Sequence, residues 1–347
     1  MEYIDLRSDT VTYPTQEMRD CLLTVELGDD VYSDDPTVNL LEKEAAELLG
    51  KEAACLVPSG VFGNQCSVLT HTRPGDEIIL ADECHMIQYE NGSLGRISRV
   101  MTKTLKTDGG ILKAKDVAGA IRTDSKSYFN PCTTLLEVEN PTALGRIYPM
   151  KDFIEVCETA SSQGLKIHLD GARLFNACCE LNVEPREICK HVDSVMICLS
   201  KGLCAPVGSL VAGSHDFIFR FRKNRKMLGG GLRQAGVIAG PGLIALRKMR
   251  HLVSDDNRIA KLIAEQLSKF SWIEVVGKVE ISMVFFKLLI KDLDLGKLAE
   301  FMKQNRILLS VPKSIDSPLR VIAHHYVREK EVEHIIQKLQ EFVHQYL

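Results

Sequence analysis

The sequence lacks the features of a disulfide-bonded secreted protein and of a membrane-spanning protein. Its eleven cysteines are odd in number and scattered, with no Cys-x-x-Cys pair, and a chain of 347 residues needs no disulfides to hold a core. The first ten residues include Glu, Asp and Arg where a signal peptide is apolar, and the longest uncharged apolar region, 235–246, is too short to cross a bilayer. We therefore interpret the protein as cytoplasmic, with reduced thiols; a precursor whose targeting segment has been removed is the alternative.

A strong excess of charge of one sign is also missing. The formal net charge is −3, the isoelectric point is near 6.4, and no long block of like charges occurs. Because nucleic-acid affinity depends on clustered Lys and Arg, we expect neither a nucleic-acid nor a membrane partner. The 45% hydrophobic content is ample for a packed core, which favours a protein that acts on a small molecule.

The hydrophobic pattern predicts an α/β protein with a mostly parallel sheet. From Lys51 to about Ser214, short apolar runs alternate with helix-like segments, which is typical of such a sheet with helices on both faces. A proline at the start and a glycine at the end predict a helix over 149–164. The expected strands are 53–57, 77–81, 133–138, 166–170, 194–200 and 207–212. Ligands bind beyond the carboxyl ends of such strands, so residues there are the candidates for function.

The chain is expected to have three parts, because single cores seldom grow beyond about 250 to 300 residues. They are an N-terminal arm (1–35), a large α/β domain (36–250) and a smaller α+β C-terminal domain (251–347). Asp35 and Pro36 predict the start of a helix that ends at Gly50. Further expected elements are one or two helices in 232–249, a helix opened by Ser254, a strand in 281–290, a helix over 294–304, strands near Ile307 and Leu319, and a closing helix from Arg328.

An acid and a lysine follow two of the predicted strands. Asp170 ends the strand 166–170, and Lys201 comes directly after the strand 194–200. Asp170 could simply cap a helix, and Lys201 could reach to solvent. Small and apolar neighbours make Lys201 partly desolvated and nucleophilic instead, so that it could form a Schiff base with an aldehyde. Pyridoxal phosphate is such an aldehyde, and its pyridine nitrogen needs an acid partner. The pair therefore predicts a pyridoxal-phosphate site.

Two further segments could complete this site. In "VPSGVFGNQ", Ser59 and Gly60 begin a helix whose backbone N–H groups could bind a phosphate, although a plain turn is an equal alternative. His85 follows the strand 77–81 and could stack on a cofactor ring, although a lone histidine is more often a surface or cap residue. Four separate segments thus point to one ligand.

The chain resembles the low-specificity L-threonine aldolases, which are fold-type I pyridoxal-phosphate enzymes. The motifs that carry the resemblance are "IDLRSDTVT", "GDDVYSDDPTVNLLE", "ELLGKEAA", "HLDGARLFNA", "ICLSKGLCAPVGS" and "RKMLGGGLRQAG". The resemblance implies the fold-type I PLP-dependent transferase-like fold, pyridoxal 5'-phosphate as cofactor, and a homodimer or homotetramer. It also implies a lyase that cleaves L-threonine or L-allo-threonine to glycine and an aldehyde.

The resemblance further assigns roles to residues. Lys201 would hold the cofactor through a Schiff base, Asp170 would pair with its pyridine nitrogen, and Tyr32 would approach from a neighbouring subunit. The expected catalytic residues are Lys201, His85 and Lys226. The expected cofactor-binding residues are Lys201, Asp170, His85, Ser59, Gly60 and Arg173. The expected substrate-binding residues are Ser8, Arg173, Arg320, Tyr32 and Tyr89, with Arg chosen because its planar fork binds a carboxylate bidentately. No metal site is expected.

The chain departs from this family at three positions. Phe129 or a neighbour replaces a second histidine that would lie near the substrate hydroxyl, Pro141 begins an apolar replacement of a polar loop, and Ala323 replaces a threonine. These changes leave a racemase or a β-eliminating lyase or dehydratase acting on a small amino acid as the alternative reaction, since a hydroxyl-directed base helps aldol cleavage. A non-catalytic cofactor-binding homologue is a further alternative.

Overall fold

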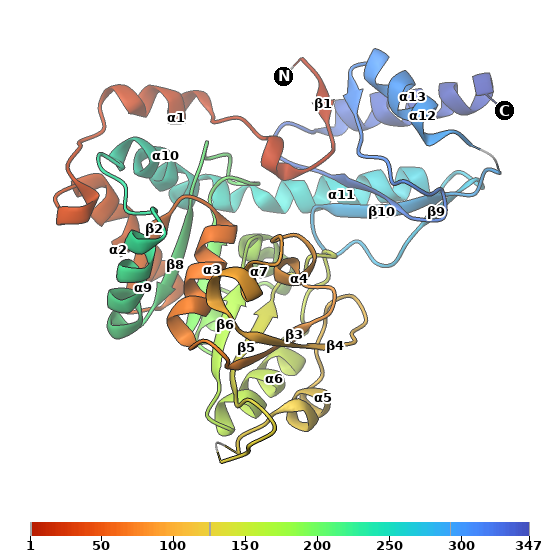
Figure 1. Cartoon of the computed structure of the whole chain (residues 1–347). Coiled ribbons are helices and arrows are strands. Elements are labelled where there is room, and N and C mark those ends of the chain that lie inside the picture. The colour runs from red at the N-terminus through yellow and green to blue at the C-terminus, as the bar shows by residue number, and fades with distance from the viewer. Residues whose placement is uncertain (1, 125, 292, 347) are drawn as a thin grey trace.

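The computed structural model describes residues 2–124, 126–291 and 293–346, and its larger part is built on a seven-stranded sheet (Figure 1). The strand order is β2 (Ala53–Val57), β8 (Ser209–Gly213), β7 (Ser194–Cys198), β6 (Lys166–Asp170), β5 (Thr133–Glu139), β3 (Glu77–Ala81) and β4 (Met101–Leu105). All neighbouring strands run parallel except β8, which is antiparallel to both β2 and β7. The predicted mostly parallel α/β sheet is confirmed.

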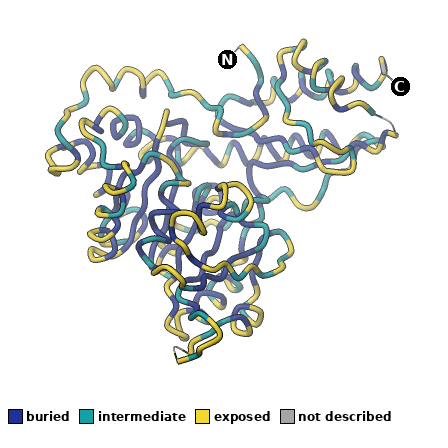
Figure 2. The backbone as a smooth tube through the Cα atoms, in the orientation of Figure 1, coloured by how far each residue is buried: buried dark blue, intermediate teal, exposed yellow. Residues whose placement is uncertain are grey.

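Helices cover both faces of this sheet, because alternate side chains of each strand point to opposite sides. Met196 and Cys198 of β7 pack with Phe217 in one hydrophobic cluster, whereas Val195 and Ile197 belong to another. The helices of this part are α2 (Pro36–Leu49), α3 (Gly60–His71), α4 (His85–Gln88), η4 (Leu94–Ser98), α5 (Ala114–Ala120), α6 (Met150–Ser162), α7 (Leu174–Leu181), α8 (Pro185–Cys189), α9 (His215–Met227), α10 (Gly236–Arg247) and η5 (Met249–His251). Apart from the edge strand β4, the strands of this sheet are largely buried (Figure 2).

The predicted helix boundaries at α2 have a clear physical cause. The Asp35 carboxylate accepts hydrogen bonds from the backbone N–H groups of Thr37 and Val38 at 3.1 and 3.0 Å, and Pro36 occupies the first helical position. Gly50 ends the helix with a φ of 64°, a left-handed conformation that glycine adopts without strain. The sequence prediction for this helix is confirmed.

The smaller part has its own sheet and its own hydrophobic cluster. Three antiparallel strands, in the order β12 (Leu319–Ile322), β10 (Met283–Leu288) and β9 (Ile273–Val275), pack with α11 (Val253–Leu267), α12 (Leu295–Gln304) and α13 (Glu329–Tyr346). β1 (Ile4–Asp5) pairs in parallel with β11 (Ile307–Leu308), and Leu6 joins this cluster. On these contacts we propose the division into arm 1–35, large domain 36–250 and small domain 251–347.

The N-terminal arm crosses from the small domain over the large one (Figure 1). It contains η1 (Asp9–Val11), α1 (Gln16–Asp20), η2 (Cys21–Leu23) and η3 (Asp30–Tyr32). Long stretches of it are exposed (Figure 2). Within the described residues, no helix combines the length and apolarity that crossing a membrane requires. All eleven cysteines are free thiols.

Several predicted boundaries differ from the structure. β4 and β9 were not predicted; β4 lies at a sheet edge and alternates exposed and half-buried side chains, so its sequence "MTKTL" has no apolar run. β7 ends at Cys198 rather than Ser200, and β8 begins at Ser209 rather than at 207. The expectation that Ser254 opens a helix is wrong: α11 begins at Val253, and the Ser254 hydroxyl donates back to the His251 carbonyl at 3.2 Å.

Candidate active site

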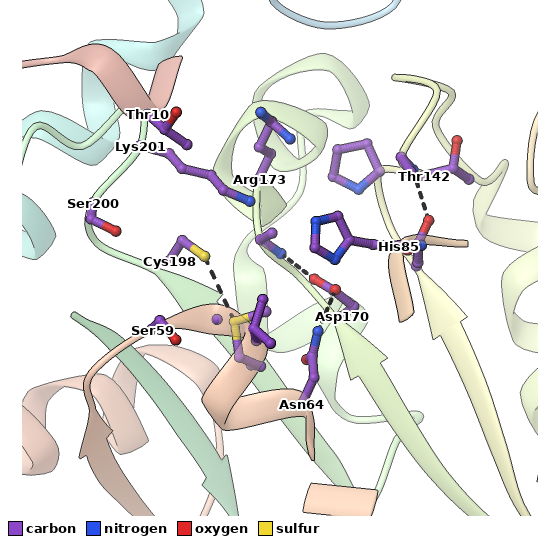
Figure 3. Close-up of a pocket in the computed structure, with 17 residues that line it drawn as sticks. Thr10, Ser59, Asn64, His85, Thr142, Asp170, Arg173, Cys198, Ser200 and Lys201 are labelled. Atoms are coloured by element: carbon purple, nitrogen blue, oxygen red, sulfur yellow. Dashed lines mark hydrogen bonds between the residues drawn. The ribbon is translucent and has the colours of Figure 1, made fainter. Parts of the chain in front are cut away.

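A pocket of about 260 Å³ lies beyond the carboxyl ends of β5, β6 and β7, where ligands of α/β proteins are expected (Figure 3). It is lined by Thr10, Ser59, Gly60, Val61, Asn64, His85, Glu139, Pro141, Thr142, Ala143, Asp170, Ala172, Arg173, Met196, Cys198, Ser200 and Lys201. Six residues predicted from the sequence thus meet at one pocket: Ser59, Gly60, His85, Asp170, Arg173 and Lys201.

Asp170 and Lys201 face each other across this pocket. Asp170 is the last residue of β6 and is 4% exposed, and its carboxylate accepts hydrogen bonds from Asn64 Nδ2 at 2.7 Å and from the Ala172 N–H at 2.9 Å. Lys201 lies in the turn after β7, and its side chain extends into the pocket (Figure 3). The Lys201 carbonyl accepts a hydrogen bond from Thr12 Oγ1 of the arm at 2.8 Å. The amine therefore projects from a backbone that is held in place.

The N-terminus of α3 forms another wall of the pocket. Ser59 caps this twelve-residue helix, with its hydroxyl accepting from the Phe62 N–H at 3.2 Å. A Cβ on Gly60 would lie 2.9 Å from Cys198 Sγ, so only glycine fits between the helix start and β7. Backbone N–H groups at such a helix start bind phosphate. An acid, an amine and a phosphate-binding helix start around one pocket fit pyridoxal phosphate.

His85 is held at the pocket by two carboxylates. Glu139 accepts a hydrogen bond from the His85 backbone N–H at 2.5 Å and another from Ala143 N–H at 2.7 Å, so it joins two walls of the pocket. His85 Nδ1 lies 3.0 Å from Glu90 Oε1. This hydrogen bond to Glu90 raises the pKa of His85 against the opposing effect of burial. The Tyr89 ring lies 5.4 Å from the His85 ring.

Two arginines are candidates for binding a substrate carboxylate: Arg173 lines the pocket, whereas Arg320 does not, although it lies near enough to Arg173 for their charges to interact. Arg173 donates to both oxygens of Asp9, at 2.7 and 2.6 Å, and both side chains are largely buried. Arg320 comes from β12 of the small domain; burial and the nearby positive charge of Arg173 lower its pKa. Ser8 caps η1 and accepts hydrogen bonds from the Thr10 N–H and hydroxyl. It does not line the pocket itself, although Thr10 does.

Three further predicted residues do not line this pocket within one chain. Lys226 is exposed near the end of α9, and its Cδ would lie 2.9 Å from a Cβ placed on Gly231. Tyr32 is 73% exposed on η3, and Tyr89 is 64% exposed beside His85. The catalytic role of Lys226 and the substrate-binding roles of Tyr32 and Tyr89 therefore remain predictions.

The three departures from the family fall in different places. Pro141 and Ala143 line the pocket. Phe129 does not approach it within one chain: it is 92% exposed and precedes β5, so it lies at the amino end of a strand whose carboxyl end meets the pocket. Its expected place near the substrate hydroxyl is therefore wrong for a single chain. Ala323 is buried in the small domain, where its N–H donates to the Ser282 carbonyl.

The sequence interpretation missed the polar residues behind the pocket. Besides Asp9, they are Asn64, Glu90, Glu137, Glu139 and His168, all buried. The sequence does contain a signal for Glu137, Glu139 and His168. The motifs "EVE" in β5 and "HLD" in β6 place these three residues on the same face of neighbouring strands as Asp170. Polar residues on alternate positions of a buried strand indicate a polar layer rather than a core.

One part of this layer has the donor types of a metal site. His85, Glu90 and Asp170 place one potential ligand atom each within 4.8 Å of one another. Asn64 Nδ2, however, already donates to Asp170 Oδ2 at 2.7 Å and to Glu90 Oε1 at 3.2 Å. The two carboxylates share an amide donor, and we assign no metal to them.

Glu137 is expected to destabilise the protein at neutral pH. It is 1% exposed, no N–H or O–H group of the described residues donates to its oxygens, and the weak donor beside it is the Cys84 thiol. Burial, followed by the charges of Glu139 and Asp170, raises its pKa well above 4.5. Folding then requires proton uptake, so stability falls as pH rises above 4.5 towards the folded-state pKa.

Glu137→Gln should therefore be more stable than the native protein at pH 7, and its advantage should shrink on acidification, with a slope of at most ~1.4 kcal/mol per pH unit. Urea unfolding at several pH values between about 5 and 7 measures this. Glu158→Gln, on the exposed side of α6, is the matched control and should not change the pH dependence. An advantage that grows on acidification would contradict the protonated state of Glu137.

Comparison with known proteins agrees with this geometry. Residues 5–288 match the model of the beta-eliminating lyase family. The chain is 42% identical to low-specificity L-threonine aldolase 1 of Arabidopsis thaliana, with 98% of this chain and 96% of that protein covered. It is 36% identical to the low specificity L-threonine aldolase of Escherichia coli K12, covering 96% and 97%.

Solved structures show the same fold. A threonine aldolase from Leishmania major superposes with a TM-score of 0.84 at 17% identity, covering 98% of this chain and 99% of that one. A PLP-dependent aminotransferase from Streptococcus suis superposes with a TM-score of 0.72 at 14% identity, covering 100% and 95%. At these identities the likeness concerns the fold, which is that of fold-type I pyridoxal-phosphate enzymes.

Proposed function

The chain belongs to the low-specificity L-threonine aldolases of the beta-eliminating lyase family, and from this premise we propose that it cleaves L-threonine and L-allo-threonine to glycine and acetaldehyde. One observation carries the proposal: Lys201, Asp170, Arg173 and the start of α3 line one pocket, and Arg320 lies near enough to Arg173 for their charges to interact. The first three groups suit the cofactor, and the two arginines suit an amino-acid carboxylate.

Pyridoxal phosphate is the cofactor of this family, and when bound it supplies an electron sink for bonds broken at the substrate Cα. Lys201 is the amine that would bind its aldehyde, and Asp170 would accept the hydrogen bond of its pyridine nitrogen. The N–H groups at the start of α3 would bind its phosphate. Each functional group of the cofactor would thus be bound by a different element: the turn after β7, the end of β6 and the start of α3.

The remaining pocket residues orient the substrate and handle its proton. Arg320 would bind the carboxylate, with Arg173 held in position by Asp9. The Glu90 carboxylate can only accept a hydrogen bond, so His85 Nδ1–H donates to it and the unprotonated Nε2 is left to accept the hydroxyl proton, directly or through a water. Pro141 and Ala143 contribute apolar groups to the facing wall, beside the polar Thr142. Lys226 is less suited to accept this proton, because it does not line the pocket.

Aldehyde release is the test. The holoprotein, with Lys201 intact, is expected to release acetaldehyde from L-threonine and L-allo-threonine and benzaldehyde from phenylserine, as followed by a coupled dehydrogenase assay or by absorbance. If the holoprotein releases no aldehyde from any of these three amino acids, the proposal is wrong.

Cleavage of the Cα–H bond is the second candidate, giving a racemase or a β-eliminating enzyme. The apolar wall and the distant Phe129 favour it, since among the described pocket residues His85 is the one histidine that can receive the hydroxyl proton. Deuterium from the solvent at Cα without aldehyde would identify this reaction. A bound cofactor whose absorbance does not respond to any amino acid would identify a non-catalytic homologue.

We also propose that the protein is a homodimer or homotetramer in the cytoplasm. Exposed apolar side chains gather on the arm, among them Leu23 at 87% and Tyr32 at 73%, and such patches indicate association surfaces. A second copy could bring Tyr32 to the pocket, as the family resemblance implies. The free thiols support a reducing compartment.

A further inference from the structure

A continuous chain of hydrogen bonds runs behind the pocket, from the end of α3 to Asp170. His71 Nε2 lies 2.7 Å from Ser194 Oγ, which lies 2.8 Å from His168 Nδ1. His168 Nε2 lies 3.2 Å from Asn64 Oδ1, and Asn64 Nδ2 donates to Asp170 Oδ2 at 2.7 Å. The chain therefore links α3, β7 and β6 to the acid of the pocket.

The direction of every bond in this chain follows from its last member. The carboxylates of Asp170 and Glu90 can only accept, so the Asn64 amide nitrogen faces them and its oxygen faces His168. That oxygen also accepts only, so the His168 proton is on Nε2. His168 Nδ1 then accepts from the Ser194 hydroxyl.

The same logic continues to the outer end of the chain. Because the Ser194 hydroxyl uses its proton on His168, its oxygen accepts the Nε2 proton of His71. Every donor thus points towards Asp170. Hydrogen bonds aligned in one direction polarise one another, and this strengthens the last bond to the carboxylate.

Burial keeps the two histidines uncharged. His168 and Ser194 are fully buried, and Asn64 is 1% exposed. Burial lowers the pKa of His71 and of His168 to about 3, so each ring carries a single proton at neutral pH. A neutral ring with one proton has one donor and one acceptor, as the chain requires at both positions.

We propose that Asn64, His168 and Ser194 are positioning residues that hold Asp170 as an anion and so keep the pyridine nitrogen of the cofactor protonated. This inference rests on the role of Asp170 in the proposed function. Glu90 shares the Asn64 amide with Asp170, and the negative charge of Asp170 raises the pKa of Glu139, so acidic neighbours repel a negative charge on Asp170. A directed chain of neutral donors offsets that repulsion without adding a buried cation.

The first test needs no variant. In protein labelled with ¹⁵N-histidine, the ¹⁵N spectrum should show His168 with a protonated Nε2 and an unprotonated Nδ1. The opposite tautomer would overturn the inference, because Nδ1–H would then donate to Ser194 and reverse the chain.

The second test breaks the chain at Ser194. Ser194→Ala leaves the Asn64 contact with Asp170 in place, and Ser194→Thr restores a hydroxyl. With ¹⁵N-labelled pyridoxal phosphate bound, the ring nitrogen should be protonated in the native protein and in the threonine variant, and less so in the alanine variant. The alanine variant should also lose about tenfold in kcat, with KM unchanged, since one neutral hydrogen bond is lost.

Ser67→Ala is the matched control, because Ser67 is a fully buried serine of α3 whose hydroxyl donates to the Gly63 carbonyl and not to the chain. It should leave the cofactor nitrogen protonated. Equal losses of protonation in the Ser67 and Ser194 alanine variants, or none in either, would overturn the inference. If the native protein releases no aldehyde but the nitrogen responds as expected, the proposed function fails and the inference stands.

Discussion

Lys201→Ala is expected to reduce aldehyde release by at least about 1000-fold, because a correctly held amine acts with an effective molarity of ~10⁵ M or more. The reason is local: the Lys201 backbone is fixed by Thr12, and its side chain enters the pocket towards Asp170 (Figure 3). No group in solution can match this placement. Coupled assay of acetaldehyde release measures the loss, and borohydride reduction followed by peptide mass spectrometry should place the cofactor on the Lys201 peptide of the native protein alone.

The Lys201 variant should keep its fold, since the side chain is half-buried and forms no hydrogen bond or ion pair with another side chain of the described residues. Its thermal unfolding should therefore match that of the native protein without cofactor. Lys223→Ala, an exposed lysine of α9, is the control and should keep full activity. Unchanged aldehyde release by the Lys201 variant would remove the central residue of the proposed site.

Arg173→Ala is expected to lower the free energy of unfolding by about 3–5 kcal/mol, the usual cost of removing one partner of a buried ion pair. Asp9 is 2% exposed and would be left without its bidentate partner. Burial alone would raise the pKa of Asp9, but the positive charge of Arg173 holds this pKa below its usual range. Denaturant unfolding without cofactor measures the effect.

Arg320→Ala provides the contrast to this variant. It removes the other arginine near the pocket but no ion pair of the described residues, so stability should change little while KM for the amino acid rises. The double variant Asp9→Asn, Arg173→Gln should recover part of the lost stability, since no charge is left unpaired. Equal destabilisation by Arg173→Ala and Arg320→Ala would show that the Asp9 pair does not stabilise the fold.

Much of the large sheet could be predicted from the sequence, because its strands are short apolar runs between helix signals. The bounds 53–57, 77–81 and 166–170 were predicted residue for residue. The antiparallel direction of β8 was not predicted. The length of the connection 199–208 could have indicated it, because a parallel crossover needs a dozen residues or more. The edge strand β4 has no such run, and only its pairing with β3 makes it a strand.

The site was predictable where strand order alone brings residues together. Asp170 and Lys201 end up at one pocket because β6 and β7 are parallel neighbours. Asn64 and Glu90 reach the site through the packing of α3 and the segment after α4, and no spacing in the sequence encodes that packing. The pairing of Asp9 with Arg173 depends on the path of the arm across the molecule, which only the tertiary structure shows.

That path of the arm determines when the site can be completed during translation. β1 pairs with β11, and the Asp5 carbonyl lies 2.7 Å from His324 Nε2, 319 positions along the chain. A nascent chain that has already formed the whole seven-stranded sheet still has no partner for residues 4–6, although Asp9 and Thr12 of the arm can already bond to Arg173 and Lys201. The cofactor pocket, lined by residues between 10 and 201, can thus form before the small domain, whereas Arg320, which we propose binds the substrate carboxylate, arrives only with β12.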